Sequence, residues 1–208
     1  MQDQDKSLIE RIRYIISAYQ PEQFTLANIA HDLGITQDEL SGHYNDEYSL
    51  VEAILQFEHN SLQSLFESTS FENGNAIDGL LKVSKQLSQR FINIIPSFNF
   101  SIKNDFPDLH QQYFRLRNEF VFDKISRNIE DGINEGLYRP DLSVELVSRI
   151  YISRLIDLYN PDFFPPAQFS FNTLFEVMFD TFIRGIATDD GVKYFEKKVK
   201  CLKFPDEG

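Results

Sequence analysis

The chain has 208 residues, of which 42% are hydrophobic and 14% aromatic, and its formal net charge is −12. This composition argues against disorder except at the chain ends, and the negative charge argues against non-specific attraction to nucleic acid or to an anionic membrane surface. The single cysteine, Cys201, excludes an internal disulfide and a zinc site built from cysteines.

Neither a signal peptide nor a membrane span is expected. The N-terminal stretch is polar and acidic and shows no small-residue cleavage site. The longest apolar stretch, FINIIPSFNFSI, is interrupted by Asn93, Pro96, Ser97 and Asn99, and it is far shorter than the roughly 20 apolar residues that a spanning helix needs. A cytoplasmic protein is the expectation.

Apolar residues recur at helical spacing along the chain, whereas the alternation typical of strands is not apparent. Prolines and glycines separate the apolar stripes from one another. The sequence therefore predicts an all-α protein. The predicted helices are a first one that ends before Pro21 and further ones over about 50–66, 77–95, 107–136, 144–158, 171–186 and 189–202.

Residues 25–50 predict two short helices joined by a tight turn. Thr25 is a suitable N-cap for the first helix, and Gly34 stands where a left-handed residue would end it. Thr36 and Glu39 have the spacing of a capping box at the start of the second helix. Two caps in tandem around a central glycine indicate a compact helix-turn-helix, an element that can dock in the DNA major groove.

The charge of this segment conflicts with DNA binding. It contains five acidic residues and neither Lys nor Arg. Residues 1–60 hold eleven carboxylates against Lys6, Arg11 and Arg13, so this region carries −8 of the total charge. Most non-specific DNA affinity comes from Lys and Arg that replace counterions on phosphates. The sequence predicts DNA binding that is weak and salt-sensitive, or already lost.

The N-terminal segment resembles the DNA-binding domain of the TetR family of bacterial transcriptional regulators. The resemblance extends to GINEGLYRPDLSVELVSRI, which is similar to the stretch before the family's first dimerisation helix, and to FDTFIRGIAT, similar to the end of its second. It implies a three-helix DNA-binding domain over residues 1–47 and a larger helical ligand-binding and dimerisation domain over 48–208. The residues that carry the resemblance in the N-terminal segment are Phe24-Thr25, Ile29-Ala30, Leu33-Gly34-Ile35-Thr36, Leu40, His43-Tyr44 and Leu50.

The resemblance also implies which residues would contact DNA. Base edges would face Gln37, Ser41, Gly42 and His43, and phosphates would face Thr25, Thr36 and Tyr44. Core packing is the competing role for Tyr44, and His43 could be an exposed histidine without a task. The family usually has a basic residue where this chain has Glu47. Glu39 could cap its helix or accept a hydrogen bond from cytosine.

An unknown small-molecule effector and a homodimer follow from the same resemblance. Broken helices around Pro96 and Pro107 favour an opening in the middle of the chain. The candidate pocket residues are Phe91, Phe98, Phe100, Tyr113 and Phe120, for which plain core packing is the alternative. The candidate interface residues are Tyr151, Leu155, Leu158, Leu174, Met178 and Phe182, which could instead form the core of a monomer.

The leading functional hypothesis is a TetR-like regulator that binds operator DNA as a homodimer and responds to a small ligand. The alternative keeps the fold, has lost DNA binding and acts through a protein partner, which the acidic N-terminal face could attract if that partner is basic. An enzyme is not expected, because the histidines lack metal-ligand spacing and no phosphate loop or nucleophile motif is present. No cofactor or metal is predicted.

Overall fold

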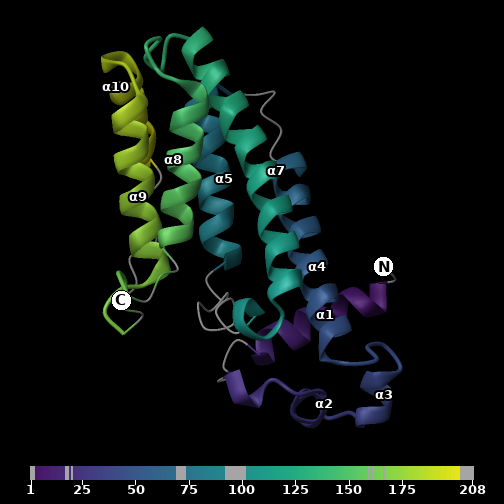
Figure 1. Cartoon of the computed structure of the whole chain (residues 1–208). Coiled ribbons are helices and arrows are strands. Elements are labelled where there is room, and N and C mark those ends of the chain that lie inside the picture. The colour runs from purple at the N-terminus through teal and green to yellow at the C-terminus, as the bar shows by residue number, and fades with distance from the viewer. Residues whose placement is uncertain are drawn as a thin grey trace. The chain divides into compact units, whose positions relative to one another are not determined.

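The computed structural model describes residues 3–16, 19, 21–68, 74–91, 102–158, 160, 162–165 and 167–201. Regular structure in these residues is helical, which confirms the all-α class (Figure 1). None of the described helices has the length and apolar character to cross a membrane. The helices are α1 (Asp3–Ile16), α2 (Leu26–Leu33), α3 (Gln37–Ser41), α4 (Glu47–Ser68), α5 (Ala76–Phe91), α7 (Pro107–Asn134), α8 (Val144–Asp157), α9 (Phe171–Ile186) and α10 (Asp189–Cys201), with a 3₁₀ turn at Pro21–Gln23.

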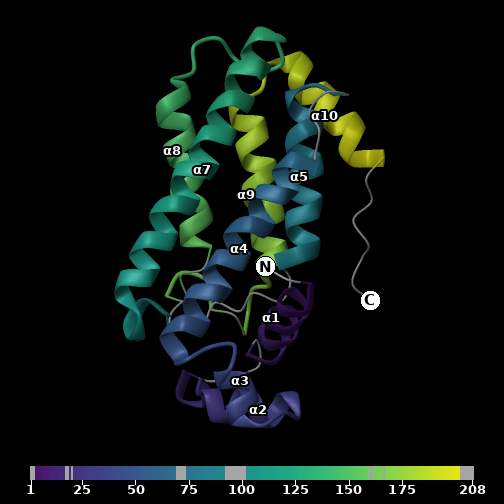
Figure 2. The same cartoon turned by 90° about the vertical axis from the view of Figure 1, so that its right-hand side faces the viewer.

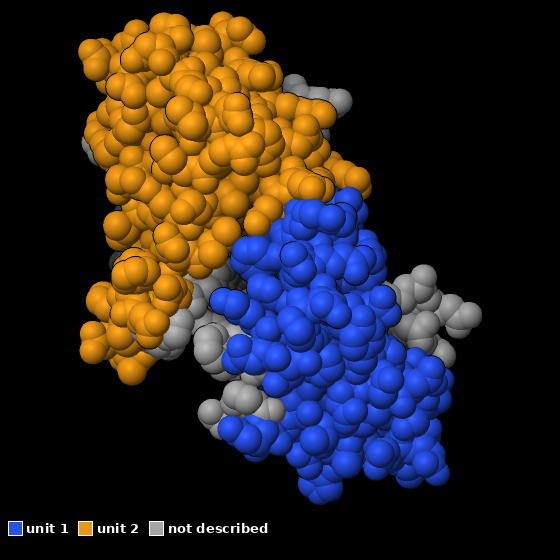
Figure 3. Space-filling model, in the orientation of Figure 1, with its two compact units in different colours: residues 1–64, 91–117 blue, residues 65–90, 118–208 orange. Residues whose placement is uncertain are grey.

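The chain divides into two compact units (Figure 3). Unit 1 comprises residues 1–64 and 91–117, and unit 2 comprises residues 65–90 and 118–208. Both α4 and α7 contribute residues to each unit. The boundary expected between residues 47 and 48 falls in the first turn of α4 and stays a prediction about where the DNA-binding segment ends.

Unit 1 is built around the N-terminal helices. Figures 1 and 2 show α2 and α3 together beneath α1 and the first turns of α4. The apolar positions of these helices point inward and are removed from water, which is the main source of their stability. The buried cluster consists of Ile9, Ile12, Ile16, Leu26, Ile29, Ala30, Leu33, Leu40, Tyr44, Leu50, Ile54 and Phe57.

A buried ion pair joins α1 to α4 inside unit 1. The Arg13 guanidinium pairs with the Glu58 carboxylate and lies 5.2 Å from the centre of the Phe57 ring. Burial raises the pKa of Glu58 above its usual value, although the positive charge of Arg13 acts in the opposite direction. The pair therefore holds two helices in register at a cost in desolvation.

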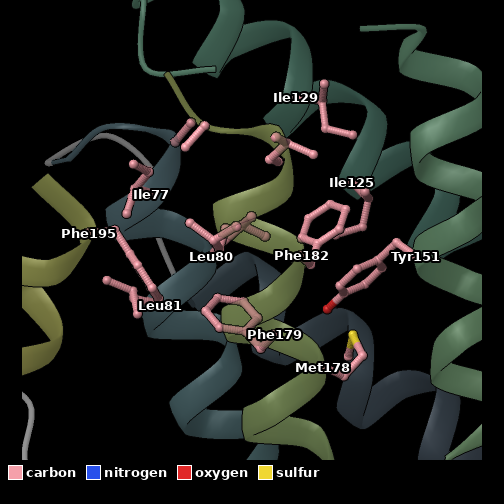
Figure 4. Close-up of a cluster of buried hydrophobic side chains, with 14 of the residues drawn as sticks. Ile77, Leu80, Leu81, Ile125, Ile129, Tyr151, Met178, Phe179, Phe182 and Phe195 are labelled. Atoms are coloured by element: carbon pink, nitrogen blue, oxygen red, sulfur yellow. The ribbon is translucent and has the colours of Figure 1, made fainter. Parts of the chain in front are cut away.

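Unit 2 packs its helices around α9. Figure 4 shows Phe179 and Phe182 of α9 among side chains from α5, α7 and α8. The buried positions of α9 recur every three or four residues, so one broad face of the helix enters the core. They are Phe175, Met178, Phe179, Phe182, Ile183 and Ile186.

Short backbone contacts join the turn after α7 to the turn after α9. The amide of Arg139 donates to the carbonyl of Ile186, and the amide of Thr188 donates to the carbonyl of Leu137, both at 2.9 Å. The fully buried ring of Tyr138 lies against Gly132, where a Cβ atom would overlap the ring. Glycine is thus required at position 132 by the close approach of the tyrosine.

Candidate nucleic-acid interface

The geometry of the helix-turn-helix follows from its caps. Thr25 has an extended backbone, and its hydroxyl accepts a hydrogen bond of 3.2 Å from the amide of Asn28. Gly34 has a φ of 71°, in the left-handed region that glycine adopts without strain. This residue turns the chain sharply enough for residues 34–36 to connect α2 to α3. The predicted helix-turn-helix is confirmed.

The capping box at α3 is also present. The hydroxyl of Thr36 accepts from the amide of Glu39 at 3.2 Å, and the Glu39 carboxylate accepts from the amide of Thr36 at 2.8 Å. Two hydrogen bonds from Thr36 lower the pKa of Glu39 below its usual value. The bond from the backbone amide has the larger effect, and the bond from the hydroxyl has the smaller one. Glu39 therefore acts as a helix cap, and its carboxylate lies at the N-terminus of α3, where a phosphate could otherwise bind.

Burial separates the seven residues expected to contact DNA into two groups. Tyr44 is only 7% exposed and belongs to the core of unit 1, so packing is its main role. The other six reach the surface and are accessible to a partner; contact with DNA remains a prediction for them. Thr36, Gln37, Gly42 and His43 are exposed, and Thr25 and Ser41 are partly exposed.

Glu47 has a structural role that the sequence did not reveal. Its Oε1 accepts a hydrogen bond of 2.9 Å from the backbone amide of Leu26, the first residue of α2. The first amides of a helix lack partners within the helix, and a carboxylate there also favours the positive end of the helix dipole. The carboxylate of Glu47 therefore caps α2 from the first turn of α4. Leu26 and Glu47 are 21 positions apart, too far for any local motif to link them.

The arginines of this region are engaged inside unit 1. Arg11 donates a hydrogen bond of 3.0 Å to the carbonyl of Leu33, at the end of α2, while it stays exposed to solvent. Arg13 is largely committed to Glu58. The side chain of Lys6 lies outside the described residues. Of these two arginines, Arg11 therefore keeps the more exposed side chain for contact with a phosphate.

Of the expected effector-pocket residues, the structure describes the side chains of Tyr113 and Phe120, one in each unit. Tyr113 lines a small cavity of about 50 Å³ in unit 1, together with residues of α4 and α7. Phe120 packs edge-on against Phe66 in unit 2, with ring centroids 5.4 Å apart. Phe91 ends α5, but its side chain lies outside the described residues, as do Phe98 and Phe100. The predicted pocket stays a prediction.

The expected interface residues lie on the inner faces of α8 and α9. Tyr151, Leu158, Met178 and Phe182 are buried within unit 2, and Leu155 and Leu174 pack against the same core. Their participation in a dimer stays a prediction. Different apolar residues of these two helices are exposed to solvent. They are Leu146 (61% exposed), Ile150 (51%) and Val177 (63%).

Among the described residues, no group of three or more His, Cys, Asp or Glu side chains is arranged to hold a metal ion.

Comparison with known proteins identifies the fold. No protein-family model and no curated protein sequence matches the chain. A TetR transcription regulator from Haloarcula marismortui is similar with a TM-score of 0.72 at 14% identity, over 90% of this chain and 100% of that one. The ketosteroid transcriptional regulator of Mycobacterium tuberculosis gives 0.65 at 18% identity, over 91% and 97%. The fatty acid degradation regulator of Bacillus halodurans gives 0.68 at 11% identity, over 88% and 96%.

These similarities cover nearly the whole of both chains in each comparison. Because the sequence identities are so low, they show the fold alone. The chain has the all-α fold of the TetR-family transcriptional regulators.

Proposed function

We propose that the protein is a transcriptional regulator of the TetR type, which binds operator DNA weakly through α2 and α3. The observation that carries the proposal is the doubly capped helix-turn-helix with Gln37, Gly42 and His43 at its surface. Gln37 at the start of α3 and His43 just after its end are exposed and can face base edges, and a glutamine amide pairs well with adenine. The TetR fold of the whole chain supports the same function.

Weak affinity follows from the carboxylates at the two helix N-termini. Glu47 caps α2 and Glu39 caps α3, so both positions that favour a phosphate already hold a negative charge. Phosphate contacts supply most of the salt-dependent affinity. Contacts with base edges would therefore provide the selectivity, and phosphate contacts would add only a little affinity.

A homodimer and a small-molecule effector complete the proposal. The exposed apolar residues Leu146, Ile150 and Val177 of α8 and α9 suit a two-fold interface. The names of two structural neighbours refer to ketosteroids and to fatty acid degradation, and we propose an apolar effector for this chain too. Effector binding would favour a spacing of the two α3 helices that no longer fits successive major grooves. The cell compartment proposed is the cytoplasm.

The test is fluorescence anisotropy with the intergenic DNA upstream of the protein's own gene, at low and near-physiological salt. Wild-type protein should bind selectively but weakly. Glu47→Lys should tighten binding about tenfold at low salt and steepen the salt dependence by about one unit, because it adds a phosphate contact. Glu130→Lys makes the same charge change at an exposed residue of α7 in unit 2. It should change neither the affinity for DNA nor the salt dependence of binding.

Glu47→Gln separates charge from structure in this experiment. It keeps an acceptor for the Leu26 amide and removes the negative charge, so its affinity should lie between those of wild type and Glu47→Lys. Melting curves show whether each variant is folded. Lack of selective binding by wild type and by every folded Glu47 variant would contradict DNA reading.

A second candidate function is binding of a basic protein partner by the helix-turn-helix face. The observation that favours it is that Glu47 and Glu39 are built into the helix caps, so the acidity of this face belongs to its architecture. A partner that depends on this charge should bind Glu47→Lys less well than wild type. DNA should show the opposite order, so the two candidates are distinguishable with the same variants.

A further inference from the structure

A cavity of about 210 Å³ lies between α5, α9 and α10 in unit 2. Figure 4 shows three of its residues, Leu81, Phe179 and Phe195, one from each of these helices. Phe175 and Val199 complete the apolar wall. Sites for drug-sized ligands span about 300 to 1,000 Å³, so this cavity suits a smaller molecule. Tyr113 and Phe120, the two expected effector-pocket residues whose side chains the structure describes, do not line it.

The polar side chains of the cavity are all acceptors. Ser84 donates its hydroxyl proton to the carbonyl of Leu81 at 3.0 Å, so the hydroxyl oxygen is left to accept. The other two are the carboxylates of Glu176 and Asp180, which accept only. A ligand that meets these groups must bring hydrogen-bond donors.

The two charged residues that line the cavity, Glu176 and Asp180, are carboxylates and favour a cationic ligand. Arg184 donates hydrogen bonds to Asp180 and to Glu196, each at 2.8 Å. One positive charge is therefore shared between two carboxylates. Glu176 lies one helical turn before Asp180 and makes no hydrogen bond or ion pair with the described residues. Lys198 of α10 is held by Asp78 at 3.0 Å. Glu176 therefore adds a second, solvent-exposed carboxylate to the lining of the cavity beside its aromatic wall.

We propose that this cavity binds a small primary amine with an apolar body. The body lies against Phe175, Phe179 and Phe195, and the ammonium group meets the Glu176 carboxylate beside Asp180. Burial of the body supplies affinity, and the carboxylates select the cation over neutral or anionic analogues. This proposal rests on the residues of α5, α9 and α10 and does not depend on DNA binding.

The probe is 3-phenylpropylamine, with about ten non-hydrogen atoms, titrated into the full chain labelled at Leu and Val methyl groups. A ligand of this size should bind with a Kd of about 1 mM and should shift the methyl signals of Leu81 and Val199 in a saturable way. 3-Phenyl-1-propanol tests the apolar body alone and should bind several-fold more weakly. 3-Phenylpropionate should bind weakest, because it faces the carboxylates.

Two variants and a matched control make the test decisive. Glu176→Gln should weaken the amine about fivefold and leave the alcohol unchanged, whereas Glu130→Gln, at an exposed residue of α7, should change neither. Val199→Phe fills the cavity and should abolish the Leu81 shift with both probes. The proposal is overturned if amine and propionate bind equally, if Glu176→Gln binds the amine like wild type, or if the methyl signals of the cavity do not move.

Discussion

The Oε1 atom of Glu47 lies 2.9 Å from the backbone nitrogen of Leu26, and this hydrogen bond ties the first turn of α4 to the first turn of α2. Thr25 satisfies the amide of Asn28, so side chains from two separate segments share the capping of one helix. A residue that looks unsuited to DNA is thereby part of what holds the helix-turn-helix together.

Removal of this cap should destabilise unit 1. Glu47→Ala leaves the Leu26 amide without its charged acceptor and should lower the free energy of unfolding by about 1 to 2 kcal/mol. Glu47→Gln keeps an acceptor and should lose less. Urea denaturation measures both, with Glu130→Ala as a surface control expected within about 0.5 kcal/mol of wild type. Equal losses for Glu47→Ala and the control would contradict the role of the cap.

The capping box of α3 makes a similar prediction at a single position. Thr36→Ala removes the hydroxyl that accepts from Glu39 and should cost about 1 kcal/mol of unfolding free energy. Thr36→Ser keeps the hydroxyl and should retain most of the stability. The comparison is again made by urea denaturation, and a serine variant as unstable as the alanine variant would exclude capping as the cause.

The buried Glu58 should make stability depend on pH. Burial raises its pKa above the usual 4.5, so the folded chain holds this proton more tightly than the unfolded chain does. The contribution of Glu58 to stability is then largest at low pH and falls as the pH rises through the raised pKa. Glu58→Gln removes this dependence.

The measurement for Glu58 is the difference in unfolding free energy between Glu58→Gln and wild type, from about pH 4 to about pH 7. The variant should gain stability relative to wild type as the pH rises. A difference that stays flat would mean that Arg13 offsets the cost of burial, and one that moves in the opposite direction would mean that Arg13 outweighs it.

The proposed dimer can be tested on the two faces of α8 and α9. Ile150→Asp changes an exposed residue and should dissociate the dimer, while the monomer keeps its stability to within about 0.5 kcal/mol. Phe182→Ala changes a core residue and should cost about 3 to 5 kcal/mol through the cavity that it leaves. Analytical ultracentrifugation gives the mass, and Leu116→Asp, at an exposed apolar residue of unit 1, is the control. A dimer that survives Ile150→Asp would exclude this face.

Local signals in the sequence predicted most of the fold. Proline at 107 begins α7, Ser143 caps α8, and Gly34 ends α2 with a positive φ, because each of these effects acts within a few residues. Whole helices could therefore be located from the spacing of apolar and capping residues.

Contacts between distant segments could not be predicted in this way. The contact between Glu47 and Leu26 and the pair of Arg13 with Glu58 each join separate helices, and no short motif records them. The apolar stripes of α8 and α9 likewise predicted which faces of these helices are buried. They did not show whether the same chain or a second copy buries them. In the structure Tyr151 and Phe182 pack against each other inside unit 2, with ring centroids 4.7 Å apart.

The backbone contacts at the end of α9 bear on the order in which the protein can fold during synthesis. The Leu137 carbonyl and the Arg139 amide form hydrogen bonds with Thr188 and Ile186, which come about fifty residues later in the chain. Phe195, which completes the core between α5 and α9, is made later still. This end of unit 2 therefore stays open on the ribosome until the last helix has emerged, whereas α1 to α4 already hold the partners that close the helix-turn-helix core.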